Sequence, residues 1–200
     1  MPSCVRSIER GFRLKSLSAT DTCRGPSVVV EAIRPSDLIE FDWEKGIFTN
    51  KWSNTRTFLF GVAGFANLRE DLHKRYYDTA LVLLHDLGAA FGENLGRLGL
   101  KRGLTVDELP STMAGLSLAG GWGKLTLASG HPSTGNSVYT NDNCVFCSAM
   151  EKKEKPSCEF LGGVLKGFTE VVVGRPHVVE EIECLATNGS STCRFTVLAP

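Results

Sequence analysis

Apolar residues recur along this chain at two different periods, and these predict separate strands and helices. They alternate with polar residues over 38–42 and 47–52, on either side of a turn at 44–46, which predicts a hairpin. From about residue 56 the spacing changes to three and four. This predicts one helix to residue 72 and a second helix over 75–98.

The second half of the chain shows both patterns again. Residues 122–128 and 137–140 predict strands, and a weaker helical pattern falls within 106–118. Pro156-Ser157 opens a helix through about Val173, with Ser157 as its N-cap. Residues 178–197 predict a closing hairpin.

The helix predicted over 75–98 carries Gly88, Gly92 and Gly96 on one face. Each glycine costs about 1 kcal/mol of helix propensity relative to alanine, so a compensating reason is needed. Close approach of another helix is the interpretation we favour. Room for a ligand is the alternative.

Residues 1–35 contain few periodic apolar positions, so we expect an N-terminal arm followed by one domain over 36–200. The 22 basic and 22 acidic residues balance, which argues against direct binding of nucleic acid or an anionic membrane. The apolar runs are too short to span a bilayer. Because the N-terminus lacks the apolar stretch of a secretory signal, we expect a cytoplasmic location.

Seven cysteines are many for this length, and five of them lie between positions 144 and 193. In a reducing compartment such a group favours a metal or redox site over a disulfide framework. A two-residue turn at Asn188-Gly189 would place Cys184 directly opposite Cys193. Side chains opposed in this way have Cβ atoms about 4.5–5.5 Å apart, which suits two thiolates on one zinc.

Cys158 lies in the first turn of the helix that follows Pro156, where the helix dipole and unpaired N–H groups favour a thiolate. It is therefore the predicted third ligand. The acidic residues before Cys184 offer a fourth. Strand alternation places Glu180 on the Cys184 face, whereas a bulge is needed to bring Glu181 inward. The residues alone do not choose between the two.

Cys144 and Cys147 have the spacing of many zinc and iron–sulfur ligand pairs. They could join Cys184 and Cys193 in a four-cysteine site that leaves Cys158 outside. They could also form a second metal site, or a redox or persulfide-sensing pair. A thioredoxin-like role is disfavoured because no helix follows the pair in a βαβ unit.

Three C-terminal segments resemble the 4-vinyl reductase domain family: Pro156-Ser-Cys-Glu-Phe-Leu-Gly-Gly-Val-Leu-Lys-Gly-Phe168, Val179-Glu-Glu-Ile-Glu-Cys184 and Cys193-Arg-Phe-Thr-Val197. Upstream segments are similar to the sensory domain of DmpR-like phenol-responsive activators, so the resemblance covers roughly residues 37–198. It implies an α+β fold, with an antiparallel sheet covered by helices, shared distantly with TRAPP subunits. It also implies a homodimer and an apolar pocket.

In those sensors three cysteines and one glutamate bind a single structural zinc. The resemblance places these ligands at Cys158, Glu181, Cys184 and Cys193, and so favours Glu181 over Glu180. Near the places of the His and Trp that hold the phenol hydroxyl, this chain has Ser117 and Asn141. Recognition of phenol itself is therefore not expected.

The expected function is a zinc-stabilised binding or sensory module that acts through dimer or partner contacts. Its ligand would be apolar: an aromatic compound, a lipid or a tetrapyrrole. The candidate ligand-binding residues are aromatic side chains that could equally be plain core: Phe65, Phe91, Trp122, Tyr139 and Phe168.

Three other functions remain open. One is an accessory subunit of a tetrapyrrole vinyl reductase, although no dinucleotide-binding glycine motif follows a strand. A zinc with four protein ligands also has no open catalytic position. The second is a TRAPP-type structural adaptor, which an empty, collapsed pocket would favour. The third is an iron–sulfur or redox protein that uses Cys144 and Cys147.

Overall fold

The computed structural model describes residues 38–134, 136–187 and 190–200. The predicted arm and the Asn188-Gly189 turn lie outside these residues. The first described elements form a small antiparallel sheet of three strands: β1 (Ile39–Asp42), β2 (Ile47–Asn50) and β3 (Thr55–Thr57). The predicted hairpin is confirmed as β1 and β2. The strand β3 was not predicted.

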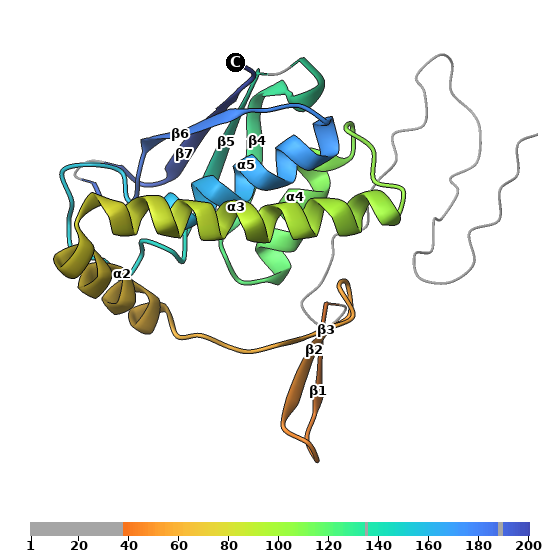
Figure 1. Ribbon diagram of the computed structural model, residues 1–200, viewed down its shortest axis with the longest axis horizontal. Helices are drawn as coiled ribbons and strands as arrows, with labels where there is room; N and C mark the ends of the chain where they lie inside the picture. Colours follow the sequence, from red (N-terminus) through yellow and green to blue (C-terminus); the bar gives the residue numbers. More distant parts are fainter. Residues whose placement is uncertain (1–37, 135, 188–189) are drawn as a thin grey trace, which may run out of the picture. The chain divides into compact units, whose positions relative to one another are not determined.

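The main sheet has four antiparallel strands in the spatial order β4-β5-β7-β6 (Figure 1). In chain order these are β4 (Lys124–His131), β5 (Asn136–Asp142), β6 (Val178–Glu183) and β7 (Cys193–Leu198). Along β5 and β7, buried residues alternate with less buried ones, as expected for a sheet with one face in the core. Tyr139 and Phe195, which are partners across these two strands, are completely buried.

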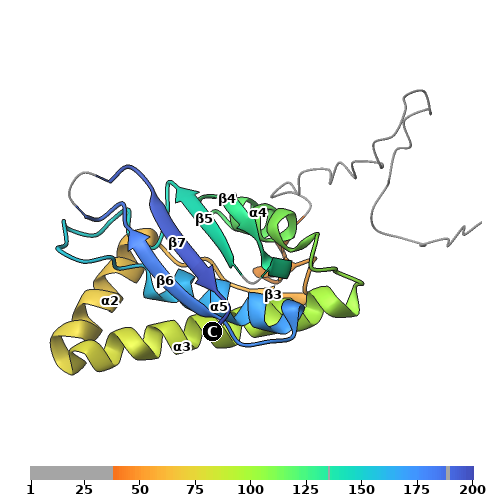
Figure 2. The ribbon, with the colours of Figure 1, turned by 90° about the horizontal axis from the view of Figure 1, so that it is seen from above.

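Four helices accompany this sheet: α2 (Val62–Tyr76), α3 (Asp78–Lys101), α4 (Leu109–Ala119) and α5 (Glu159–Val173). Figure 2 shows α5 against the sheet, with α3 on the other side of α5. The α+β prediction of an antiparallel sheet covered by helices is therefore confirmed. No helix in the described part of the chain is both long and apolar enough to cross a membrane.

Two helix predictions need correction. Helix α2 begins at Val62 rather than near residue 56, and Phe58 is an exposed residue ahead of it. In α3 the predicted apolar stripe is only partly buried, because Leu87 is 60% and Phe91 39% exposed. The best-buried face of α3 is instead the one that carries its glycines.

The backbones of α3 and α5 touch along this glycine face. A Cβ added at Gly92 would overlap the carbonyl oxygen of Val164 and lie 2.9 Å from the backbone nitrogen of Phe168. One added at Gly163 would overlap the carbonyl oxygen of His85. Real Cβ atoms do not approach other atoms so closely, so both helices need glycine at these positions. The interpretation that another helix approaches closely is confirmed.

This contact predicts opposite effects of alanine at two neighbouring positions. Gly163→Ala should lower the free energy of unfolding by at least about 2 kcal/mol, because the new methyl group overlaps backbone atoms that cannot rotate away. Gly162→Ala is the matched control. Its Cβ would meet atoms only at 3.9 and 4.0 Å, so the gain in helix propensity, about 0.5–1 kcal/mol, should dominate. Urea unfolding of both variants tests the contact, and equal effects would contradict it.

Candidate metal centre and the neighbouring cavity

Five cysteine side chains from separate segments meet in the core. Cys144 and Cys147 lie in the loop after β5, and Cys158 is the N-cap residue of α5. Cys184 follows β6, and Cys193 begins β7. All five are buried and none forms a disulfide.

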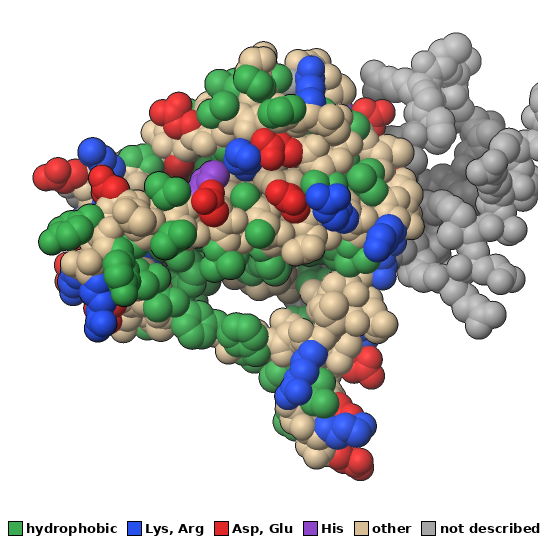
Figure 3. Space-filling view, viewed as in Figure 1, with side chains coloured by type: hydrophobic (Ala, Val, Ile, Leu, Met, Phe, Trp, Pro, Cys, Tyr) green, Lys and Arg blue, Asp and Glu red, His purple; other side chains and the backbone are tan. Residues whose placement is uncertain are grey.

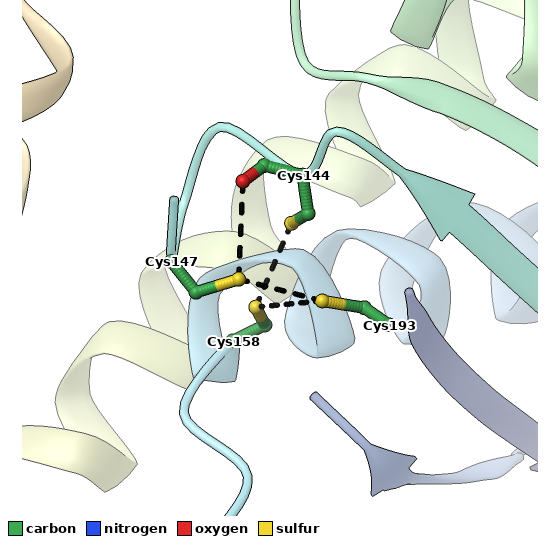
Figure 4. A group of neighbouring side chains, drawn as sticks. All are labelled: Cys144, Cys147, Cys158 and Cys193. Carbon is green, nitrogen blue, oxygen red and sulfur yellow. Dashed lines mark hydrogen bonds between the residues drawn. The ribbon is translucent and has the colours of Figure 1, made fainter. Parts of the chain in front are cut away.

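The sulfur atoms are spaced as ligands of one ion would be. The Sγ–Sγ distances are 3.6 Å for Cys144–Cys158, 3.4 Å for Cys147–Cys193, 3.9 Å for Cys158–Cys184 and 3.7 Å for Cys158–Cys193 (Figure 4). A tetrahedral zinc with Zn–S bonds of about 2.3 Å requires a separation of about 3.8 Å between its sulfur ligands. The cluster therefore fits zinc without rearrangement of the backbone.

Glu181 brings a carboxylate to the same place because β6 is irregular. The pairing register between β6 and β7 shifts between Glu181 and Glu183, which breaks the simple alternation of faces. Glu180 is consequently exposed. Glu181 turns inward: its Oε2 accepts a hydrogen bond from the Cys158 backbone N–H at 2.7 Å. Its Oε1 is buried and has no hydrogen-bond partner among the described residues.

The register of this hairpin is as predicted only close to its turn. Glu183 pairs with Arg194, which is the register that sets Cys184 opposite Cys193. Beyond the bulge the pairing is displaced by one residue, so that Glu181 faces Phe195. The bulge that the sequence required for Glu181 to reach the cysteines is therefore present.

The start of α5 is capped differently from the prediction. The N-cap residue is Cys158 rather than Ser157, and the Ser157 hydroxyl donates to the carbonyl of Lys155 instead. The Glu181 carboxylate accepts the Cys158 N–H in its place. A negative charge at a helix N-terminus is favoured by the helix dipole, so Glu181 stabilises α5 from a distant strand.

Two groups of four ligand atoms lie within mutual reach. Cys144, Cys147, Cys158 and Cys193 form one, and Cys158, Glu181, Cys184 and Cys193 form the other; within each group all atoms lie within 4.8 Å of one another. The four residues that the resemblance implied are thus brought together. The Cys144/Cys147 pair is joined to them, and Cys158 is not left outside. Which of these atoms hold a metal stays a prediction.

The acid–base properties of the cluster reflect burial and crowding. Burial, with a further contribution from the Cys184 thiolate, raises the pKa of the Glu181 carboxyl to about 9. Hydrogen bonds from neighbouring thiols, that of Cys147 first, lower the pKa of Cys184 to about 6. Contacts with the other thiols, Cys144 first, raise the pKa of Cys158. Several acidic groups thus compete for negative charge in one dry place, and a cation there would favour the anionic form of each.

An ion-pair network fixes the first turn of α5. The buried guanidinium of Arg69, on α2, donates to both oxygens of Glu159 at 3.0 and 2.5 Å. Arg69 also contacts Glu70 at 2.9 Å, and Glu70 contacts Lys153 at 2.7 Å. Because Glu159 directly follows Cys158, this network holds α2 and the loop before α5 beside the cysteines.

Removal of Arg69 should therefore be costly. Arg69→Met leaves the partly buried Glu159 without its partner, and we expect a loss of about 2–3 kcal/mol in the free energy of unfolding. Arg97→Met is the control, because the Arg97–Glu93 pair is exposed at 65% and 43% and spans 3.4 Å. Such surface pairs contribute less than about 1 kcal/mol. Denaturant unfolding compares the two, and equal losses would contradict a special role for Arg69.

An aromatic cluster lies beside the sulfur atoms. Its contacts join Phe65 and Phe91 to Phe160, and Trp122 to Phe91 and Phe146, with ring centroids 5.6–6.1 Å apart. Three of the predicted ligand-binding residues thus belong to one cluster. Phe146 and Phe160 were missed, although Phe146 lies inside the Cys144–Cys147 motif.

A small apolar cavity lies between α3, α4, β4 and α5. Its volume is about 10 Å³, room for at most one water. Trp122 and Phe168 are among its lining residues, and Ser117 contributes its hydroxyl-bearing side chain. The hydroxyl donates to the Gly123 carbonyl at 3.0 Å. The predicted Tyr139 is buried in β5 and does not line this cavity.

A larger hollow of about 250 Å³ is open to the surface between α2 and α3. It is lined by apolar side chains, including Leu72, Tyr76, Leu83 and Leu87. On the face seen in Figure 3, apolar side chains gather over α2. Exposed apolar surface of this kind is typical of an interaction site.

Comparison with known proteins agrees with this picture of the C-terminal third. Residues 137–199 match the vinyl-4-reductase domain. The resemblance to the 4-vinyl reductase domain is thereby confirmed. The matched segment begins in β5 and ends after β7, so it contains all five clustered cysteines and Glu181.

An uncharacterized protein of Methanocaldococcus jannaschii is 38% identical to this chain over 60 residues. The aligned part is 30% of this chain and 32% of that protein, so the chain spans about a third of this relative. The likeness therefore concerns a segment about the size of the vinyl-4-reductase domain rather than the whole of either protein.

Two solved structures extend the likeness to most of the fold. The phenol-responsive sensory domain of the transcription activator PoxR, solved with phenol, superposes with a TM-score of 0.70 at 19% identity. It covers 82% of this chain and 88% of that one. Trafficking protein particle complex subunit 3 of Naegleria fowleri, covalently bound to palmitic acid, gives 0.53 at 17% identity and covers 70% and 92% of the two chains. Together they confirm the fold that accompanies the vinyl-4-reductase domain here.

Proposed function

We propose that this chain is a sensory module that binds an apolar small molecule and is stabilised by a structural zinc. The observation that carries the proposal is the apolar cavity beside the aromatic cluster, with a single hydroxyl, that of Ser117, in its wall. Apolar walls with a few placed polar groups are typical of small-molecule sites. The shared fold of a phenol-responsive sensory domain supports the proposal.

Binding requires this cavity to enlarge. Pockets that hold drug-sized ligands have volumes of about 300 Å³ or more, far above the present cavity. Phe91 is 39% exposed and its ring lies 5.6 Å from that of Trp122, which also lines the cavity. Rotation of such half-exposed rings opens a path that a buried aliphatic wall would not. An aromatic ligand then replaces the ring contacts that it breaks.

The zinc belongs at Cys158, Glu181, Cys184 and Cys193. Three soft thiolates and one carboxylate suit a closed, four-coordinate structural site. The buried, unpartnered Oε1 of Glu181 supports this set, because a buried carboxylate oxygen without a partner is costly unless a cation or proton compensates it. Bound there, zinc joins the start of α5 to the ends of β6 and β7. Thiol ligands favour a reducing, cytosolic location.

Loss of the zinc should unfold the C-terminal third. Cys158→Ser, Cys184→Ser and Cys193→Ser should each lose metal and cooperative unfolding, because metal-binding free energy contributes directly to folding. Ser157→Ala is the control, since its hydroxyl only contacts Lys155. Elemental analysis and thermal unfolding of purified proteins measure both properties. Retention of metal and fold by all three serine variants would refute the site.

Ligand binding is testable with defined probes. Indole, naphthalene and palmitate should be compared by native mass spectrometry and thermal shift. A probe at 100 times its Kd should stabilise the protein by about 2.7 kcal/mol. Ser117→Val fills part of the cavity, and we expect it to weaken binding of the active probe at least tenfold. Leu83→Ser, in the open hollow of α2 and α3, should leave it unchanged. The reverse pattern would move the site to that hollow.

A structural adaptor is the second candidate, favoured by the small size of the cavity. In an adaptor the hollow between α2 and α3 would serve a second copy of the chain or a partner protein. We propose the same surface for dimerisation of the sensory module. Only the sensor requires a bound small molecule, so failure of every probe and of every retained ligand to appear in native mass spectra would favour the adaptor.

A further inference from the structure

We propose that the five cysteines and Glu181 form one binuclear site, in which the thiolates of Cys158 and Cys193 bridge two divalent cations of the zinc class. The inference deepens the metal site proposed above and rests on it for one of the two cations. It assigns a role to Cys144 and Cys147 that a single structural zinc leaves without one.

The two ligand groups share one edge. Cys158 and Cys193 belong to both groups, and their Sγ atoms are 3.7 Å apart. The residues unique to one group come from the loop after β5, and those unique to the other come from the end of β6. They thus approach the shared pair from different segments. Two tetrahedra with a common edge are the geometry of two cations bridged by two thiolates.

The Cys144/Cys147 pair lies against the predicted ligands rather than against itself. Cys144 Sγ is 3.6 Å from that of Cys158, and Cys147 Sγ is 3.4 Å from that of Cys193 (Figure 4). Both side chains are almost completely buried. A disulfide switch within the pair would instead need the two sulfurs to face each other. The contacts favour shared coordination.

Charge balance permits the second cation. Six anionic groups around two divalent ions leave the same residual charge as four anionic groups around one. With a single zinc, Cys144 and Cys147 would remain protonated thiols pressed against two coordinated thiolates. A second cation takes up both of them as terminal ligands and displaces their protons to solvent.

An iron–sulfur cluster fits the same sulfurs less well. In such clusters the cysteines bind the outer irons, and inorganic sulfide lies between the irons. The cysteine sulfurs are then separated by the cluster itself. The distances here, 3.4–3.9 Å, are those of ligands that share one ion.

Native mass spectrometry of the full chain, reconstituted with zinc, tests the proposal. We expect two zinc ions per chain. The double variant Cys144→Ser/Cys147→Ser should keep one, and so should Glu181→Gln/Cys184→Ser, because each removes the terminal ligands of a single cation. With ¹¹³Cd in place of zinc, the native chain should give two resonances and each double variant one.

A single zinc in the native chain overturns the binuclear site without touching small-molecule binding. If Cys144→Ser/Cys147→Ser then keeps that zinc, the ion belongs to the group with Glu181, and the proposed structural zinc stands. If this variant loses the zinc while Glu181→Gln/Cys184→Ser keeps it, the four-cysteine group holds the ion, and both metal assignments fail.

Discussion

The contact between the backbones of α3 and α5 is the constraint on which the rest of the structure depends. Glycines at Gly92 and Gly163 let the two helices meet at carbonyl distance, and the sheet covers the opposite side of α5. Helix α5 therefore has almost no freedom to rotate or slide. Its first residue carries a sulfur of the cysteine cluster, and its middle turns wall the cavity.

The cysteine cluster solves a problem of charge in a dry core. Burial of several thiolates and a carboxylate is expensive unless a cation accompanies them. The ligands come from a loop, a helix start and two strand ends, so any ion they share joins parts of the chain that are distant in sequence. Arg69 completes the arrangement from outside, because its pair with Glu159 holds α2 next to the same helix start.

The sequence predicted the elements better than their contacts. Periodicity identified the four helices and the main strands because each buries one face. The apolar stripe of α3 misled, since glycines carry no hydrophobic signal yet form the buried face. The inward position of Glu181 depends on a bulge, which strand alternation cannot reveal, and only the family resemblance favoured it. The Asn188-Gly189 turn itself lies outside the described residues.

The cavity shows the limit of residue-type reasoning. Aromatic residues at Phe65, Phe91 and Trp122 suggested a pocket, and they do lie together, but against other rings rather than around a space. Tyr139 is indistinguishable from these in the sequence and is plain core. How much volume remains between packed side chains depends on differences of about one methyl group, which no pattern of polar and apolar positions encodes.

Leu161, Val164 and Phe168, which line the cavity, belong to the same rigid helix that starts at Cys158. A guest that displaces this rod by a fraction of an ångström also shifts a sulfur within the cluster. By thermodynamic reciprocity, whatever free energy the guest takes from the ion, the ion takes from the guest. Occupancy at either end would then be reported at the other without any hinge or moving domain.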